Sequence, residues 1–301
     1  MSDQSEKDTY HKGSPFPYPG GKGRYATNII EQMPDHECYV EVFGGSGATL
    51  YNKPRSDCEV YNDVNDDLVQ FFRVVRDCVD ELAEWLEMVP YSRTLYEQWA
   101  SEYYNGERPD DPVERAGRFY TLRFMQWGGV IGMKNGFKAR STFRSPAKTF
   151  NNARDRVRSI AKRFSSVIIE NQDWREILDA YDGGHVFMYL DPPYLDRGRY
   201  YHAEGFDHAA LANALVSVDA NWMVSYDEVP GEFVAQMIGE TRSGARQFYV
   251  LEMDGYHQLA QGHGSSGDEV TERLVCNFDP TSTAQFVDGS QHQSKLSEVS
   301  A

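Results

Sequence analysis

Short hydrophobic runs alternate with amphipathic segments along most of this chain. Five runs have the length and the β-branched and aromatic content of buried strands: 39–43, 59–62, 166–170, 186–190 and 222–227. Hydrophobic residues at helical spacing follow each of them, for example Leu211, Leu215 and Val218. Two further runs, 248–251 and 272–278, predict closing antiparallel strands. Strands that alternate with helices predict an α/β fold with a largely parallel sheet.

This alternation stops between residues 81 and 164. Up to residue 127 the hydrophobic spacing is helical, and Asn135-Gly136 then gives a strong turn signal. We therefore expect residues 81–164 to be a mainly helical insertion into one domain made of residues 13–80 and 165–280. The polar ends, 1–12 and 281–301, are expected to be tails without fixed structure.

The segment Asp191-Pro192-Pro193-Tyr194 directly follows the strand predicted at 186–190. Its prolines end the strand, because neither can donate an N–H group to a neighbouring strand. Ligands bind at this carboxyl edge in open α/β sheets. The Asp191 carboxylate and the Pro192 carbonyl offer two acceptors, and Tyr194 offers a flat face, a set that suits a planar group bearing NH2. A simple strand-ending turn is the alternative, since most Asp-Pro pairs are only that.

A glycine turn, Phe43-Gly44-Gly45-Ser46-Gly47, follows the first predicted strand and opens a helix. Without Cβ atoms, such a turn lets a ligand approach the backbone closely. It lacks the last glycine of the dinucleotide fingerprint, where Leu50 stands, and the GK[ST] of a phosphate loop. Asp63 ends the second strand, where α/β folds often bind ribose hydroxyls, although it could equally cap the next helix.

Another glycine-rich loop, from Tyr18 through Lys22 to Gly23, runs into an amphipathic segment near the start of the chain. The N–H groups at a helix start favour an anionic group such as a carboxylate. A plain loop with a surface lysine is equally compatible with this segment.

Charge is distributed unevenly along the 301 residues, whose net charge is −16. Residues 134–163 contain ten basic residues against one acidic residue, Asp155, so this window carries +9 and the remainder −25. Basic residues interleaved with phenylalanines fit contacts to a phosphate backbone and to unstacked bases, with a solvated basic face as the alternative. The acidic remainder suits a high-salt cytoplasm, which suggests a halophilic host.

No hydrophobic run is long enough to span a membrane, and the first residues lack the apolar core of a signal peptide, so we expect a cytoplasmic protein. The four cysteines form no CxxC pair and the eight histidines are scattered. We therefore expect reduced thiols and no metal site.

Taken together, residues 14 to 278 resemble the Dam-type family of DNA adenine-N6 methyltransferases. The family's motifs occur here in the order of its α group: the glycine loop ending at Lys22, the turn from Phe43 to Gly47, Asp63, a target-recognition insertion and the segment 191–194. The resemblance implies a Rossmann-like S-adenosylmethionine-dependent methyltransferase sheet with a mainly helical inserted target-recognition domain. It also implies methyl transfer to the N6 atom of an adenine that is flipped out of DNA.

Site residues follow from the same resemblance. Asp191, Pro192, Pro193 and Tyr194 are implied to be catalytic, with the first two accepting the amino hydrogens and the tyrosine stacking on the base. Cofactor binding is implied for Tyr18 and Lys22 near the methionine end, for Phe43, Gly45 and Gly47 beneath the cofactor, for Asp63 on the ribose, for Asp173 near the adenine, and for Asp191. DNA contacts are expected from the basic window: Lys134, Asn135, Lys138, Arg140, Arg144 and Lys148.

Several alternatives stay open. Tyr18 stands where tryptophan is frequent in the family, and the Gln126-Trp127-Gly128-Gly129 stretch differs from common members, so the recognition sequence is undetermined. The acceptor could instead be cytosine N4, an RNA adenine or a protein amide. A catalytically inactive DNA-binding relative is a further alternative, whereas the broken fingerprint disfavours a nicotinamide dehydrogenase. We expect a monomer on double-stranded DNA, with a cognate restriction endonuclease and a viral origin both open.

Overall fold

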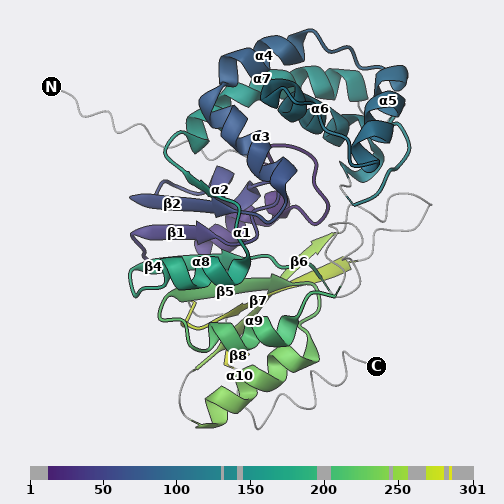
Figure 1. Cartoon of the computed structure of the whole chain (residues 1–301). Coiled ribbons are helices and arrows are strands. Elements are labelled where there is room, and N and C mark those ends of the chain that lie inside the picture. Colours follow the sequence, from purple (N-terminus) through teal and green to yellow (C-terminus); the bar gives the residue numbers. More distant parts are fainter. Residues whose placement is uncertain are drawn as a thin grey trace, which may run out of the picture.

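A single eight-stranded sheet forms the centre of the molecule, with strand order β3-β2-β1-β4-β5-β7-β6-β8 (Figure 1). The structure is a computed structural model, which describes residues 13–129, 132–140, 145–194, 205–243, 247–256, 269–280 and 285–286. The parallel strands are β1 (Cys38–Glu41), β2 (Cys58–Asn62), β3 (Ile168–Glu170), β4 (Val186–Leu190) and β5 (Asn221–Tyr226). The antiparallel strands are β6 (Tyr249–Tyr256), β7 (Glu269–Cys276) and β8 (Gln285–Phe286). The α/β fold and its antiparallel closing strands are thus confirmed.

Helices cover both faces of this sheet. One face packs on α8 (Trp174–Tyr181), α9 (His208–Leu215) and α10 (Gly231–Ser243). The other packs on α1 (Ala26–Glu31), α2 (Ala48–Asn52) and α3 (Asp66–Asp77), with the 3-10 turn η1 (Lys22–Arg24) before α1. Every residue of β4 is buried, because alternate side chains enter the two cores. This two-sided burial explains its uninterrupted apolar run.

The insertion is a helical lobe beside α3, seen at the top of Figure 1. It contains α4 (Val79–Glu87), α5 (Arg93–Tyr104), α6 (Pro112–Met125) and α7 (Pro146–Phe164), with the short turn η2 (Trp127–Gly129) after α6. The helix α3 ends at Asp77, because Cys78 leaves the helical region (φ −136°, ψ 40°) and redirects the chain into α4.

Stacked aromatic rings join this lobe to α3, which covers one face of the sheet. Phe71 of α3 stacks on Tyr120 of α6 with ring centroids 5.2 Å apart, and Phe72 stacks on Phe164 of α7 at 4.4 Å. Buried residues of the lobe and of the sheet face belong to one continuous hydrophobic cluster. The insertion therefore shares its core with the α/β domain.

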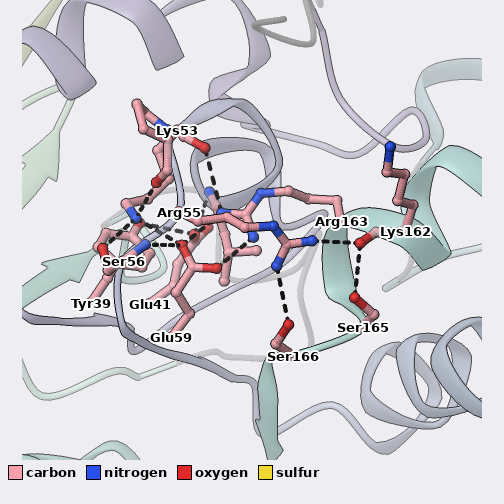
Figure 2. A network of polar contacts seen from close by, with 12 residues as sticks. Tyr39, Glu41, Lys53, Arg55, Ser56, Glu59, Lys162, Arg163, Ser165 and Ser166 are labelled. Carbon is pink, nitrogen blue, oxygen red and sulfur yellow. Dashed lines mark hydrogen bonds and ion pairs between the residues drawn. The ribbon is translucent and has the colours of Figure 1, made fainter. Parts of the chain in front are cut away.

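A buried ionic network also ties α7 to the sheet (Figure 2). Glu59 of β2 accepts from Lys53 Nζ at 2.8 Å and from the Arg163 guanidinium, at 2.7 Å to Nη2. Lys53 Nζ lies 4.6 Å from the ring centroid of Tyr39, whose hydroxyl donates to Glu41 at 2.9 Å. Removing one partner of a buried pair of this kind typically costs about 3–5 kcal/mol.

The C-terminal segment 281–301, expected to lack structure, is paired with the sheet at one point. Gln285 and Phe286 form β8 and pair with Val250 and Tyr249 of β6. Residues 281–284 and 287–301, like the tail 1–12, lie outside the described residues. Among the residues described, no helix is long and apolar enough to cross a membrane.

Candidate active site

A cleft lies at the carboxyl ends of the central strands, between the glycine turn after β1 and the segment after β4. Most residues predicted for cofactor binding and catalysis line it together. They are Tyr18, Lys22, Phe43, Gly45, Asp63, Asp191, Pro192, Pro193 and Tyr194. The parallel strands bring them together although up to 176 positions separate them in the chain.

The glycine turn is held in a conformation that requires glycine. Gly45 has a left-handed φ of +50°, and a Cβ atom there would lie 2.9 Å from the Tyr18 ring. Its N–H donates to Asp63 Oδ2 at 2.8 Å, and its carbonyl accepts from the Tyr61 hydroxyl at 2.7 Å. These bonds fix the turn to the end of β2, so that Tyr18 and Asp63 border the same part of the cleft.

Asp63 presents a partly buried carboxylate to this cleft. Its Oδ1 accepts from the Asn65 N–H at 2.8 Å, and its Oδ2 from Gly45. Burial raises the pKa of Asp63 to about 6, against the opposing effect of these two backbone donors. A carboxylate oxygen has two lone pairs, so each Asp63 oxygen can accept one more hydrogen bond from a ligand hydroxyl.

Asp191 anchors the opposite end of the cleft. Its Oδ1 accepts from Lys22 Nζ at 2.8 Å and from the Ser225 hydroxyl at 3.0 Å, and Ser225 in turn bonds to the Tyr189 hydroxyl at 3.0 Å. Burial raises the pKa of Asp191, although the Lys22 ammonium opposes that shift. The carboxylate is thus held at a fixed position with part of its surface still open to the cleft.

Lys22 has an ammonium buried among acceptors. Besides Asp191 it donates to the Tyr194 hydroxyl at 2.6 Å and to the Gly20 carbonyl at 3.2 Å, and it lies 3.3 Å from Glu272 Oε1. Burial alone would lower the pKa of Lys22, but Asp191 and Glu272 outweigh it and raise that pKa well above its usual value. The alternative of a plain loop with a surface lysine is therefore wrong.

Tyr194 is 7% exposed and also donates its hydroxyl to the Glu272 carboxylate. Lys22 Nζ is nearer to the Tyr194 hydroxyl oxygen (2.6 Å) than to the ring centroid (4.8 Å). The ammonium therefore meets the tyrosine at its hydroxyl end. This contact fixes the direction of the ring relative to Asp191.

Two residues predicted for the cofactor do not line this cleft. Asp173 is the N-cap of α8, where its carboxylate accepts from the Arg175 N–H at 2.9 Å and pairs with the Arg175 side chain at 3.1 Å. Gly47, with φ +65°, is the N-cap of α2, and a Cβ atom there would lie 2.9 Å from Phe164. Their contacts are those of helix ends.

Three buried polar residues of the strands complete the site, and sequence analysis did not single them out. Glu41 lines the cleft and accepts from the Leu50 N–H at 2.8 Å, and burial raises its pKa to about 8. Ser225 and Glu272 contact Asp191 and Lys22. The signal available in the sequence was a polar residue inside a strand that is otherwise apolar.

The described residues of the loop 125–140, which are 125–129 and 132–140, fold back on one another at one end of α6. Trp127 N–H donates to the Gly136 carbonyl at 3.1 Å, and Asn135 Nδ2 donates to the Trp127 carbonyl at 3.2 Å. Trp127 is 46% exposed, and Lys138 Nζ lies 5.8 Å from its ring centroid. Of the other predicted DNA contacts, Lys134 pairs with Glu97 at 3.1 Å, Arg140 and Lys148 are exposed, and Arg144 lies outside the described residues.

Other basic residues of the window 134–163 are used within the fold. Arg154 donates to carbonyls at the end of α4, for example that of Leu86 at 3.0 Å, Arg158 pairs with Asp80, and Arg163 pairs with Glu59. The net charge of the window therefore overstates what is available to a ligand. Exposed basic side chains remain near the loop 125–140 and the start of α7.

A parallel sheet closed by antiparallel strands, with a glycine turn after β1, an acid after β2 and Asp191–Tyr194 after β4, forms a Rossmann-like fold with a ligand cleft at the carboxyl ends of its strands. The model of the D12 class N6 adenine-specific DNA methyltransferase family matches residues 18–241. The chain belongs to this family.

Curated relatives are similar over a shorter part of the chain. The Type II methyltransferase M.MjaIII of Methanocaldococcus jannaschii is 27% identical over 197 residues, covering 58% of this chain and 66% of the relative. The DNA adenine methylase of Haemophilus influenzae is 27% identical over 195 residues, covering 61% and 64%. The Type II methyltransferase M.CviBI of Paramecium bursaria Chlorella virus NC1A is 25% identical over 182 residues, covering 58% and 66%. The chain thus spans less than two thirds of the length of these relatives.

Proposed function

We propose that this protein transfers a methyl group from S-adenosylmethionine to the N6 atom of an adenine extruded from double-stranded DNA. The single observation that carries the proposal is that one cleft contains two groups of residues. Asp63 and the glycine turn lie at one end of it, and Asp191 and Tyr194 lie at the other. Membership of the family supports adenine as the acceptor. We also propose that the protein acts as a monomer.

The residues at the donor end fit the proposed cofactor. Asp63 has acceptor capacity for ribose hydroxyls, and Phe43 offers an apolar edge beside the glycine turn. When bound, S-adenosylmethionine supplies an electrophilic methyl group on a sulfonium. At the other end of the cleft the Lys22 ammonium faces two carboxylates, Asp191 and Glu272, and this excess of negative charge suits a cationic donor.

At the acceptor end, Asp191 and the Pro192 carbonyl would each accept one hydrogen of the amine. An exocyclic amine is a poor nucleophile, because its lone pair is delocalised into the ring. Two fixed acceptors favour a more tetrahedral nitrogen and direct its lone pair toward the donor. The nitrogen would then form the new C–N bond as the methyl C–S bond of the bound donor breaks and leaves a neutral thioether, and the nitrogen would release one proton to solvent, with Tyr194 against the base.

DNA would contact the loop 125–140 and the start of α7. Trp127 is exposed beside Lys138, and such pairs of aromatic and basic residues bind unstacked bases and phosphates. Lys134, Asn135, Arg140, Arg144 and Lys148 are proposed phosphate or base contacts. Two relatives reported above carry the name Type II methyltransferase, so we also propose a cognate restriction endonuclease.

Expression in a host free of DNA methylation tests the proposal. We expect N6-methyladenine at one consensus sequence in the host genome, and none when Asp191→Ala is expressed at the same level. Modified cytosines instead would support the N4 alternative. An unmodified genome together with modified cellular RNA would support the RNA alternative.

A further inference from the structure

Glu272 of β7 lies behind the cleft, against the two residues that hold its acceptor end. Its Oε1 is 3.3 Å from Lys22 Nζ, and it accepts the Tyr194 hydroxyl. The residue is 4% exposed and does not line the cleft, so it cannot touch a ligand there. It also lies outside residues 18–241, the part that the family model matches.

Sheet register explains why this carboxylate reaches the site. Leu274 is paired with Ser225 of β5, and Glu272 lies two residues before it on the same face. Leu274 and Tyr189 both face the core on the α1–α3 side of the sheet. Glu272 therefore enters the row of polar groups formed by Ser225 and Tyr189 at the ends of the parallel strands.

The formal charges of Lys22 and its acidic partners do not cancel. One ammonium faces two carboxylates, Asp191 at 2.8 Å and Glu272 at 3.3 Å, so the formal charge of this cluster is −1. If Asp191 were the sole counter-ion of Lys22, the cluster would be neutral and Asp191 would accept less strongly from other donors. A negative cluster stabilises positive charge that develops on an amine nitrogen during its alkylation.

We propose that Glu272 is a positioning residue for methyl transfer, acting through Lys22 and Tyr194. Its carboxylate shares the ammonium with Asp191 and holds the Tyr194 hydroxyl, so that the acceptor oxygen and the tyrosine ring keep one fixed arrangement. This inference rests on the proposed function.

Glu272→Gln tests the charge, because the amide oxygen can still accept the Tyr194 hydroxyl. At saturating S-adenosylmethionine and DNA we expect the single-turnover rate to fall at least tenfold, while the Kd for DNA changes less than threefold. Glu272→Asp, which keeps the charge, should recover part of the rate. The matched control is Glu252→Gln, an exposed carboxylate on the neighbouring strand β6 that pairs with Arg273 at 3.2 Å, and its rate should stay within twofold of wild type.

A double-mutant cycle separates positioning from a structural role. If Glu272 acts through the Lys22 ammonium, the rate loss of Glu272→Gln with Lys22→Met will be smaller than the product of the two single losses. Two results would overturn the inference without affecting the proposed function: a wild-type rate in Glu272→Gln, or independent losses in the cycle. Failure of the wild-type protein to methylate adenine would instead overturn the proposed function. Melting temperatures identify unfolded variants, for which Glu272→Asp replaces Glu272→Gln in the cycle.

Discussion

Glu41 is the cleft residue whose proton is most directly tied to stability. Its pKa is raised to about 8 by burial, whereas the unfolded chain titrates near the usual value of 4.5. The folded protein therefore binds more protons than the unfolded one between these values, so the unfolding free energy falls as pH rises from about 4.5 to about 8. The effect is on the order of a few kcal/mol.

Glu41→Gln should remove this contribution, because the amide keeps an acceptor for Leu50 and Tyr39 but does not titrate. Urea unfolding at a series of pH values measures the change. We expect a flatter dependence of stability on pH than in the wild type. An unchanged slope would show that Glu41 is already ionised in the folded protein.

Asp63 and Asp173 give the second prediction at this scale, since sequence analysis assigned both to the cofactor and the structure places one of them in the cleft. Asp63→Asn should raise the Kd for S-adenosylmethionine at least tenfold in calorimetry. The wild-type affinity should also weaken as pH falls through about 6, where Asp63 becomes protonated. Asp173→Asn, which keeps an N-capping side chain, should change the Kd less than twofold. Equal losses in both variants would restore Asp173 to the site.

Among the elements, we expect the loop after α6 to contact DNA, because Trp127 is exposed there beside Lys138. Trp127→Ala should weaken binding of a DNA duplex by roughly 5- to 150-fold, because base stacking on an aromatic side chain contributes about 1–3 kcal/mol. Fluorescence anisotropy measures this affinity. Ile168→Thr, at an exposed apolar position on the edge strand β3, is the control that should bind normally. Normal binding by Trp127→Ala would move the DNA surface elsewhere.

The positions of strands and motifs along the chain could be predicted at this scale, and the partners of buried charges could not. The runs before Gly44, Asp63 and Asp191 identified three strands, because a strand buried on both faces leaves a clear apolar signature, and the structure places these strands side by side. Glu272 was read only as a strand residue, since its contact with Lys22 depends on register across an antiparallel pair. Likewise, local sequence could not reveal that Arg163 neutralises Glu59.

On the scale of the whole molecule, the net charge of −16 sets the response to salt. Self-repulsion of a strongly acidic surface is screened as ionic strength rises. If the halophilic interpretation holds, the unfolding free energy should rise between about 0.1 M and about 2 M KCl. Maximum stability and activity at low salt would contradict it.

Transfer of tritium from labelled S-adenosylmethionine to DNA, followed by separation of the nucleosides, tests the central claim most directly. We predict that label appears in N6-methyladenine with the wild-type protein and is absent with Asp191→Ala, whose fold should survive because Lys22 keeps Glu272 as a counter-ion. Label in N4-methylcytosine, no label in DNA, or near-normal turnover by Asp191→Ala would contradict the account.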